Sequence, residues 1–110
     1  MSGRREQAKQ FVSQALADQK VVVFSKSYCP FCKKAKDALA TILDPSMFVV
    51  YELDERNDCI EIQDALAEVS GGRSVPRVFV DSQFIGGGDD TARMAKNGEL
   101  QKLLADKGAL

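Results

Sequence analysis

Two of the three cysteines in the chain, Cys29 and Cys32, lie three residues apart in the segment "SYCPFCKK". Cysteines at this spacing can ligate a metal, form a structural disulfide, or cycle between dithiol and disulfide. A structural zinc site takes four protein ligands, and the sequence offers no histidine and one further cysteine, Cys59, so two chains would have to share the metal. A static disulfide would close only a small loop and would be unusual in a reducing compartment. We therefore interpret the pair as redox-active, with no metal expected.

Cys29 follows a predicted strand and precedes a predicted helix. The unbroken apolar run over 21–24 is typical of a strand that is covered on both faces. Pro30 suits the first helical position, and a residue before proline avoids helical backbone angles, so Cys29 is predicted to be the N-cap. Side chains three residues apart within a helix have Cβ atoms about 5–6 Å apart, whereas a disulfide needs about 3.5–4.5 Å. Moving Cys29 off the helix lets the pair close.

The same position is expected to activate the Cys29 thiol. Its sulfur can face the free N–H groups of the first turn, near Phe31 and Cys32, at the positive end of the helix dipole. That interaction is worth about 0.3–2 kcal/mol, or at most about 1.5 pKa units, so a lower pKa requires directed N–H···S bonds and nearby cations. The cations of this segment are Lys26, Lys33 and Lys34. We predict that Cys29 is the nucleophile and that the more shielded Cys32 is the resolving thiol.

The composition of the whole chain limits the classes of function. Its 110 residues predict a single domain, 1–110, with the 45% apolar and 28% charged residues of an ordinary globular protein. A net charge of −1 argues against a nucleic-acid partner, which would require a positive field. No segment has the roughly 20 apolar residues of a membrane span, and no apolar region follows the basic N-terminus as in a secretory signal. We expect a cytoplasmic protein with no membrane partner; an organellar form whose presequence has been removed is the alternative.

Apolar residues at helical spacing predict the elements that must position the cysteines. Three helices are predicted in this way, over residues 8–16, 35–43 and 62–69. Asp44-Pro45 is expected to end the second helix, and Asp58 with Glu61 resembles a capping box at the start of the third. A shorter helix, capped by Asp89 or Asp90 and ending at Asn97-Gly98, and a last helix from Leu100 to Leu104 complete the set.

Three further segments are predicted to be strands. Residues 47–53 form one candidate, and 77–80 with 83–85 read as a hairpin whose turn is Asp81-Ser82. A strand, helix and strand in succession imply a parallel pair with a right-handed crossover, while the hairpin adds antiparallel strands. The predicted fold class is α/β, with a four-stranded mixed β-sheet and helices on both faces.

Four separated blocks of the sequence resemble the dithiol glutaredoxins (class I, C-P-Y-C type), a family with the thioredoxin-like fold. "VVVFSKSYCPFC" is similar to the family's strand and turn that carry the cysteines, with Phe31 where tyrosine is commoner. Gln63 matches a glutamine on the third helix, "RSVPRVFV" resembles the valine-proline loop, and "IGGGDD" resembles the diglycine and acidic loop. Thioredoxin itself is less similar, because its motif has tryptophan before the first cysteine and Gly-Pro between the two.

The resemblance implies a binding site for glutathione beside the cysteines. It implies that Val75-Pro76 is a cis bond and that the backbone of Val75 pairs with the cysteinyl residue of glutathione. By the same analogy Lys26 and Gln63 take the glycyl carboxylate, with help from Arg73. An ordinary trans turn and solvated surface cations are the plainer alternatives.

The other end of glutathione would lie at the acidic loop, with Phe31 also among the implied binding residues. Gly88 would allow close approach, and the N–H groups of the helix that begins at Asp89-Asp90 would take the γ-glutamyl carboxylate. The side chain of Asp90 could pair with the ligand amine; alternatively both aspartates are plain N-caps. The family often has serine where Asp89 stands, so its extra negative charge is expected to weaken carboxylate binding.

The activity implied by the resemblance is glutathione-dependent thiol–disulfide exchange. Cys29 alone would reduce mixed disulfides between proteins and glutathione, and Cys29 with Cys32 would reduce protein disulfides. The expected partners are glutathione, as co-substrate, and glutathionylated or disulfide-bonded proteins, with the chain acting as a monomer. The alternative is a dimer that binds a [2Fe–2S] cluster through the first cysteine and glutathione. Cys59 either packs under a helix terminus or is a regulatory thiol.

Overall fold

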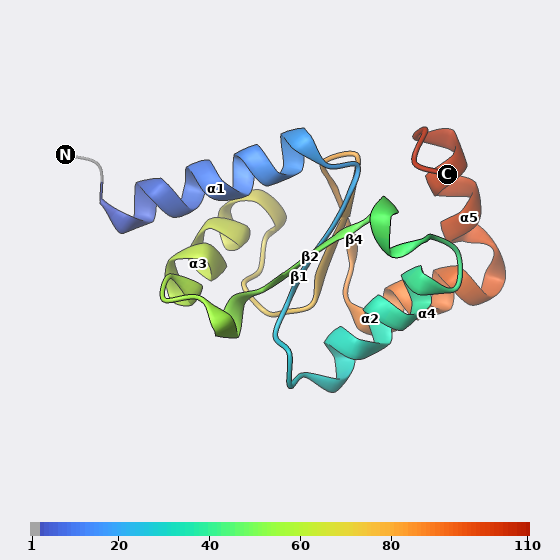
Figure 1. The fold of residues 1–110 in the computed structure, drawn as a ribbon, viewed down its shortest axis with the longest axis horizontal. Helices are drawn as coiled ribbons and strands as arrows, with labels where there is room; N and C mark the ends of the chain where they lie inside the picture. Colours follow the sequence, from blue (N-terminus) through green and yellow to red (C-terminus); the bar gives the residue numbers. More distant parts are fainter. Residues whose placement is uncertain (1–2) are drawn as a thin grey trace.

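The computed structural model describes residues 3–110 and contains one four-stranded sheet in the order β2-β1-β3-β4 (Figure 1). The strands are β1 (Val21–Ser25), β2 (Val49–Glu52), β3 (Arg77–Val80) and β4 (Gln83–Gly86). β1 pairs with β2 in parallel and with β3 in the antiparallel sense, and β3 pairs antiparallel with β4. The predicted mixed sheet and the predicted hairpin are both confirmed.

Within residues 3–110, five helices cover the two faces of this sheet (Figure 1). α1 (Arg4–Asp18) and α3 (Cys59–Ser70) lie on one face, while α2 (Pro30–Ala40), α4 (Gly88–Asn97) and α5 (Glu99–Asp106) lie on the other. Each face has its own apolar core, because side chains alternate between the two faces along every strand. Within residues 3–110 no helix is both long and apolar enough to cross a membrane.

The central strand β1 explains the unbroken apolar run in the sequence. All five of its residues are buried. Val22 and Phe24 pack with α1 and α3, whereas Val21 and Val23 pack with α2 and α5. A strand whose two faces are both covered has no need of polar alternation. Its carboxyl end leads directly into the turn that carries the cysteines, so this buried strand fixes the position of that turn.

Two predicted elements are shorter in the structure. α2 ends at Ala40 rather than at Asp44, because the backbone tightens into a turn in which the Ile42 N–H bonds to the Leu39 carbonyl three residues back, at 3.0 Å. This turn places Leu43 in the core without extending the helix. The strand predicted over 47–53 covers only β2, because a 3-10 turn, η1 (Pro45–Met47), precedes it and another, η2 (Leu53–Glu55), follows it.

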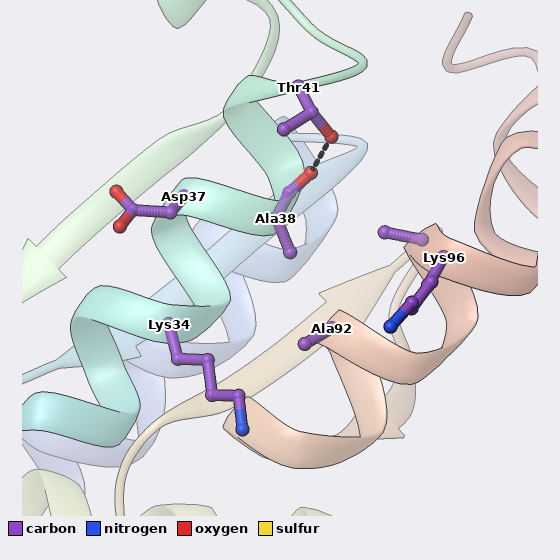
Figure 2. A pocket seen from close by; sticks show the side chains of 7 residues that line it. Lys34, Asp37, Ala38, Thr41, Ala92 and Lys96 are labelled. Carbon is purple, nitrogen blue, oxygen red and sulfur yellow. Dashed lines mark hydrogen bonds between the residues drawn. The ribbon is translucent and has the colours of Figure 1, made fainter.

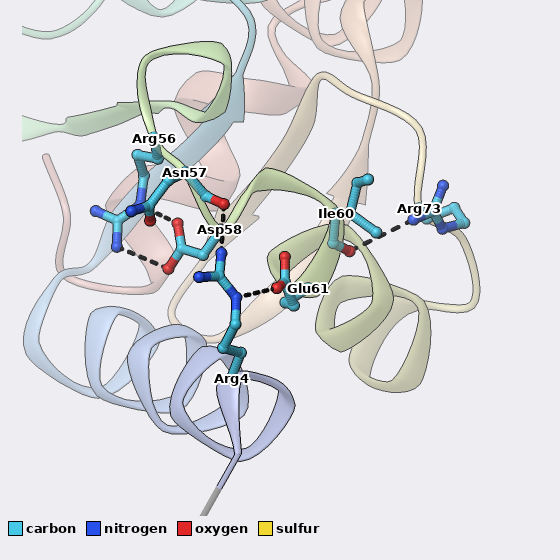
Figure 3. Close-up of polar contacts among 7 residues, drawn as sticks. All are labelled: Arg4, Arg56, Asn57, Asp58, Ile60, Glu61 and Arg73. Atoms are coloured by element: carbon cyan, nitrogen blue, oxygen red, sulfur yellow. Dashed lines mark hydrogen bonds and ion pairs between the residues drawn. The ribbon is translucent and has the colours of Figure 1, made fainter.

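The capping box predicted at the start of α3 is wrong. Asp58 occupies the N-cap position but its side chain makes no capping bond. Its carboxylate instead accepts from the Arg56 guanidinium, with Nε 2.8 Å from Oδ1, and the Glu61 carboxylate pairs with Arg4 of α1 (Figure 3). Cations from outside the helix therefore compete successfully for both carboxylates.

The cap predicted for α4 is also corrected. The helix begins at Gly88 with Gly87 as its N-cap, so Asp89 and Asp90 lie inside the first turn. The side chain of Asp90 reaches back to the cap residue, and its Oδ2 accepts the Gly87 N–H at 3.4 Å. The predicted end of this helix at Asn97-Gly98 is confirmed.

Candidate redox-active site

Cys29 lies at the junction of β1 and α2, where the sequence predicts it. It is the N-cap of α2, with extended backbone angles (φ −88°, ψ 121°), and Pro30 is the first helical residue. The Cys29 carbonyl already accepts the first helical bond, from the Lys33 N–H at 3.0 Å. The predicted displacement of Cys29 from the helix is therefore confirmed.

The environment of Cys29 favours its thiolate. Its sulfur accepts a hydrogen bond from the Cys32 backbone N–H at 3.4 Å. Partial burial acts to raise the pKa of Cys29, but the Cys32 thiol, the backbone N–H groups of Cys32 and Phe31, and the positive charge of Lys26 together lower it below the ordinary cysteine value. These are the directed N–H···S bonds of a helix N-terminus.

The three lysines of the segment contribute unequally. Lys33 Nζ pairs with Asp37 Oδ2 at 2.7 Å, and Lys34 Nζ pairs with Asp89 Oδ1 at 2.6 Å. The positive charge of each is therefore compensated by a carboxylate. Lys26 is the lysine that acts on the Cys29 thiolate. The sequence predicted that three lysines lower the pKa of Cys29, and in the structure Lys26 is the one that does so.

Cys32 differs sharply from Cys29 although it is only one helical turn away. Its side chain is 0% exposed, whereas Cys29 is partly exposed. Burial and the neighbouring Cys29 thiol raise the pKa of Cys32, although its sulfur accepts the Lys26 backbone N–H at 3.4 Å. The pair therefore joins an accessible thiol with a lowered pKa to an enclosed thiol with a raised pKa.

A carboxylate that the sequence analysis missed supports the turn before Cys29. Asp54, in η2, accepts the Ser27 backbone N–H at 2.9 Å with one oxygen and the Ser27 hydroxyl with the other. These bonds lower the pKa of Asp54. The carboxyl ends of the parallel strands β1 and β2 lie at the same edge of the sheet. That parallel pairing, already predicted, was the signal that could have placed Asp54 beside the turn.

The loop between α3 and β3 is held by residues predicted to bind glutathione. Gln63 is 9% exposed, and its Nε2 donates to the Arg73 carbonyl at 2.8 Å. The Cys59 thiol is 3.5 Å from Gln63 Oε1 and packs against the core, as the structural interpretation of Cys59 expects. The Arg73 guanidinium donates to Asp64 at 2.9 Å and to the Ile60 carbonyl, the contact drawn in Figure 3. The bond that follows, Val75-Pro76, is cis as predicted.

The N-termini of α2 and α4 meet beside this loop. A Cβ atom on Gly88 would lie 2.4 Å from the Phe31 carbonyl oxygen, so Gly88 allows close contact between the two helices. A Cβ atom on the preceding Gly87 would lie 3.5 Å from the Pro76 carbonyl oxygen. The cis-proline loop, the start of α4 and the start of α2 therefore converge.

A groove lies between α2 and α4 (Figure 2). Its volume is about 310 Å³, and its lining combines Lys34 and Lys96 with the small side chains of Ala38 and Ala92. A second hollow of about 560 Å³ has both Asp89 and Asp90 in its lining. Neither lining includes a cysteine, so the grooves lie beside the thiol pair rather than over it.

The family model for glutaredoxin matches residues 21–85, a segment that contains β1, β2, β3, all but the last residue of β4, the cysteine pair and the cis-proline loop. The chain belongs to the glutaredoxin family. Glutaredoxin-C4 of Arabidopsis thaliana is 50% identical over 98 residues, which are 89% of this chain and 71% of that protein. The family assignment agrees with the resemblance seen in the sequence and supports a thiol oxidoreductase role.

Solved glutaredoxin structures also superpose on the chain. Oxidized glutaredoxin 2 from Chlamydomonas reinhardtii has a TM-score of 0.91 at 51% identity, and the match covers 96% of this chain and 98% of that one. A buckwheat glutaredoxin–glutathione complex has a TM-score of 0.87 at 33% identity and covers 97% and 96% of the two chains. The predicted thioredoxin-like fold is therefore confirmed for this glutaredoxin.

Proposed function

We propose that this glutaredoxin is a glutathione-dependent thiol–disulfide oxidoreductase that reduces protein–glutathione mixed disulfides and protein disulfides. The observation that carries the proposal is the asymmetry of the cysteine pair. Cys29 is partly exposed and its pKa is lowered, whereas Cys32 is fully enclosed and its pKa is raised. Attack on an external disulfide requires an accessible thiolate, and resolution within the molecule does not require access from outside.

The proposed monothiol path uses Cys29 alone. Its thiolate attacks the glutathione sulfur of a protein–glutathione mixed disulfide and releases the protein thiolate, which takes up a proton. A second glutathione thiolate then attacks the mixed disulfide between Cys29 and glutathione. This step releases oxidised glutathione, made of the substrate's glutathionyl group and the incoming glutathione, and regenerates the Cys29 thiolate, so one free glutathione is consumed for each mixed disulfide reduced.

The proposed dithiol path uses both cysteines. Cys29 attacks one sulfur of a protein disulfide and forms a mixed disulfide with it, while the other sulfur leaves as a thiolate and takes up a proton. Cys32, as thiolate, then attacks the Cys29 sulfur, releases the second protein thiol and leaves a Cys29–Cys32 disulfide. Glutathione reduces that disulfide in two further exchange steps. The N-cap position of Cys29 supports this path, since it frees the side chain from the geometry of a regular helix.

The proposed glutathione site extends to both sides of Cys29. Support comes from the buckwheat glutaredoxin–glutathione complex and from the convergence of the cis-proline loop with the N-terminus of α4. We propose that Val75 pairs through its backbone with the cysteinyl residue. Gln63 already orients the loop through the Arg73 carbonyl, so the glycyl carboxylate would meet Lys26 and the edge of a fixed loop.

At the other end, the free N–H groups at the start of α4 would take the γ-glutamyl carboxylate. The negative charge of Asp89, expected to weaken this contact, is compensated by Lys34 Nζ at 2.6 Å. Asp90 has an equivalent but longer contact with Arg93, 3.5 Å between Nη2 and Oδ1. This weaker pairing leaves Asp90 the better candidate partner for the glutathione amine.

A glutathione-coupled assay with the three single-cysteine variants tests the proposal. Cys32→Ser should retain reduction of a glutathionylated protein but lose at least about tenfold of its activity on a protein disulfide. Cys29→Ser should lose both activities, because the nucleophile is gone. Cys59→Ser is the matched control and should retain both. Appreciable activity in Cys29→Ser, or equal loss of both activities in Cys32→Ser, would contradict the assigned roles.

A further inference from the structure

Ser25, the last residue of β1, is a buried polar side chain that the proposed chemistry has not yet used. It is 0% exposed, and its hydroxyl has no hydrogen-bond partner among residues 3–110. The buried hydroxyl of Thr91 differs, since it donates to the Gly87 carbonyl at 2.7 Å. A buried hydroxyl without a partner destabilises a fold, because it has lost its bonds to water. The other four residues of β1 are apolar, so Ser25 needs an explanation.

The position of Ser25 directs its side chain toward α2. Side chains alternate along a strand, and Val21 and Val23 pack in the core on the α2 face. Ser25 therefore lies on that face, at the carboxyl end of β1 and beneath the first turn of α2. The next backbone N–H along the chain, that of Lys26, donates to Cys32 Sγ at 3.4 Å. The Ser25 hydroxyl and the Cys32 sulfur thus share the same buried corner.

One other charged side chain faces this corner from β2. Glu52 is the register partner of Ser25, and its Oε2 accepts from Lys36 Nζ of α2 at 2.7 Å. Its Oε1 is buried without a partner among residues 3–110, so it is a competing acceptor for the Ser25 proton. The Cys29 thiol is the ionisable group that acts on Cys32 from the other side.

We propose that the Ser25 hydroxyl is a second hydrogen-bond donor to the Cys32 sulfur, beside the Lys26 N–H, whenever that sulfur carries negative charge. Ser25 would then serve the dithiol path specifically, an inference that rests on the proposed function. Burial raises the pKa of Cys32, while the Lys26 N–H and the Ser25 hydroxyl act in the opposite direction.

The proposed donor acts at two steps. In the resolving step, Cys32 loses its proton to solvent, and the new thiolate attacks the Cys29 sulfur of the mixed disulfide. A Cys29–Cys32 bond forms, the bond to the substrate breaks, and the released substrate thiolate takes up a proton. In the reverse direction, a glutathione thiolate attacks the Cys29 sulfur and Cys32 leaves as a thiolate. The hydroxyl of Ser25 stabilises the charge on Cys32 in both steps and stays protonated itself.

Ser25→Ala removes the donor without adding volume, and its effect on Cys32 can be measured directly. In a Cys29→Ser, Cys59→Ser background Cys32 is the one thiol, because the sequence has three cysteines. Ultraviolet titration of its thiolate should show that adding Ser25→Ala to this background raises the pKa by about one unit, the effect of one lost bond to a charged group. Ser13→Ala, at an exposed position of α1, is the matched control and should shift nothing. An unchanged Cys32 pKa in Ser25→Ala would overturn the inference.

A kinetic cycle locates the effect on the reaction path. With its pKa raised by one unit, Cys32 has about tenfold less thiolate near neutral pH, but each thiolate is about threefold more nucleophilic. Ser25→Ala should therefore slow intramolecular closure from the glutathionylated Cys29 form about threefold. In a Cys32→Ser background, where closure cannot occur, Ser25→Ala should leave reduction of a glutathionylated protein by the monothiol path unchanged. Ser25→Thr, which keeps the hydroxyl, should restore the Cys32 pKa. In a Glu52→Gln background the shift should persist. Its disappearance there would assign the hydroxyl to Glu52 and overturn the inference.

The melting temperature separates this role from a structural one. Because the hydroxyl has no partner within residues 3–110 of the folded protein, Ser25→Ala should leave the reduced protein equally or more stable while the Cys32 pKa rises. A lower melting temperature with an unchanged pKa would make Ser25 structural and overturn the inference. Wild-type reduction of protein disulfides is measured alongside. Its absence would count against the proposed function, whereas its presence with an unaffected Cys32 in Ser25→Ala would count against the Ser25 inference alone.

Discussion

Two chemically identical side chains, one helical turn apart, acquire opposite properties in this glutaredoxin. Cys29 stands outside the helix and accepts the N–H of Cys32, whereas Cys32 lies inside the helix and is enclosed by the core. The first environment stabilises a thiolate and the second disfavours it. The sequence contained this distinction in Pro30, which fixes the start of the helix after Cys29.

At the residue scale we predict that Lys26 and Lys33 differ in their effect on Cys29. Lys26→Met should raise the Cys29 pKa by up to about 0.7 units, the equivalent of about 1 kcal/mol for a solvated charge. Lys33→Met should have a smaller effect, because Asp37 already compensates the charge of Lys33. The pH dependence of iodoacetamide labelling, followed at Cys29 in a Cys59→Ser background, measures both pKa values. Equal shifts in the two variants would contradict the special role of Lys26.

At the scale of elements, the site depends on joining pieces that are distant in the chain. η2 reaches the turn before Cys29 through Asp54, and α4 reaches α2 at Gly88. The loop before β3 is held to α3 through Gln63. The contacts of Asp54 and Gln63 hold a turn and a loop that have no regular hydrogen-bonding pattern of their own. The turn that carries Cys29 is therefore positioned from several elements, and its geometry depends on side chains that take no part in the exchange of electrons.

We predict that Asp54→Ala loosens the turn before Cys29. The variant should have a lower melting temperature and a lower kcat on glutathionylated substrates, because Ser27 loses the acceptor for its N–H and its hydroxyl. The folded-state pKa of Asp54 is lowered, so its stabilising contribution is present above the unfolded-state pKa and lost as pH falls toward the folded-state value. Thermal melts from neutral to acidic pH should therefore converge for the variant and wild type.

Asp106→Ala is the matched control for Asp54, since Asp106 lies exposed at the end of α5. It should change neither the melting temperature at neutral pH nor kcat. A constant difference between Asp54→Ala and wild type at every pH would show that the charge of Asp54 is not what supports the turn.

The sequence predicted the existence and order of the elements better than their ends. Stripes of apolar residues and the buried run in β1 depend on which face meets the core, and that pattern is local. The failed capping box at Asp58 and Glu61 has a different cause. Glu61 pairs with Arg4, which is 57 positions away in the chain. Local spacing cannot predict a partner that only the packing of α1 against α3 supplies.

In the candidate site, too, the residues that follow a local sequence pattern were predicted, and those placed by tertiary structure were not. The roles proposed for Cys29 and Cys32 were predicted from their spacing and from Pro30, which places Cys29 outside the helix and Cys32 within it. Asp54 and Ser25 escaped notice because a carboxylate after a strand and a serine at its end are common in any sequence. Their importance depends on the parallel pairing of β1 with β2 and on the alternation of side chains along β1, which bring both to the turn that carries the cysteines.

At the scale of the whole molecule, the two thiols couple the charge of the site to the stability of the fold. The pKa of Cys29 is lowered, so between its folded-state value and the ordinary cysteine value of about 8.5 the unfolded chain binds more protons and stability rises with pH. The pKa of Cys32 is raised, so above the ordinary value the folded protein binds more protons and stability falls with pH.

We therefore predict that the thiol contribution to the stability of the reduced protein passes through a maximum near the ordinary cysteine pKa. It is measured as the difference in unfolding free energy between wild type and a Cys29→Ser, Cys32→Ser variant, both kept reduced, in urea titrations across neutral to alkaline pH. The subtraction removes the titration of lysines, which the two proteins share. A difference that changes steadily in one direction would be inconsistent with opposite shifts at the two cysteines.

The complete enclosure of Cys32 has a consequence for what the molecule can exchange with its surroundings. Of the two thiols in the pair, only Cys29 can be reached from solution, and Cys32 can react only with the Cys29 sulfur beside it. An oxidant too bulky to pass Cys29 must therefore react with the Cys29 sulfur first, whatever its chemistry. The burial of Cys32 thus fixes the order in which the two thiols react, and it protects Cys32 from direct oxidation by molecules in solution.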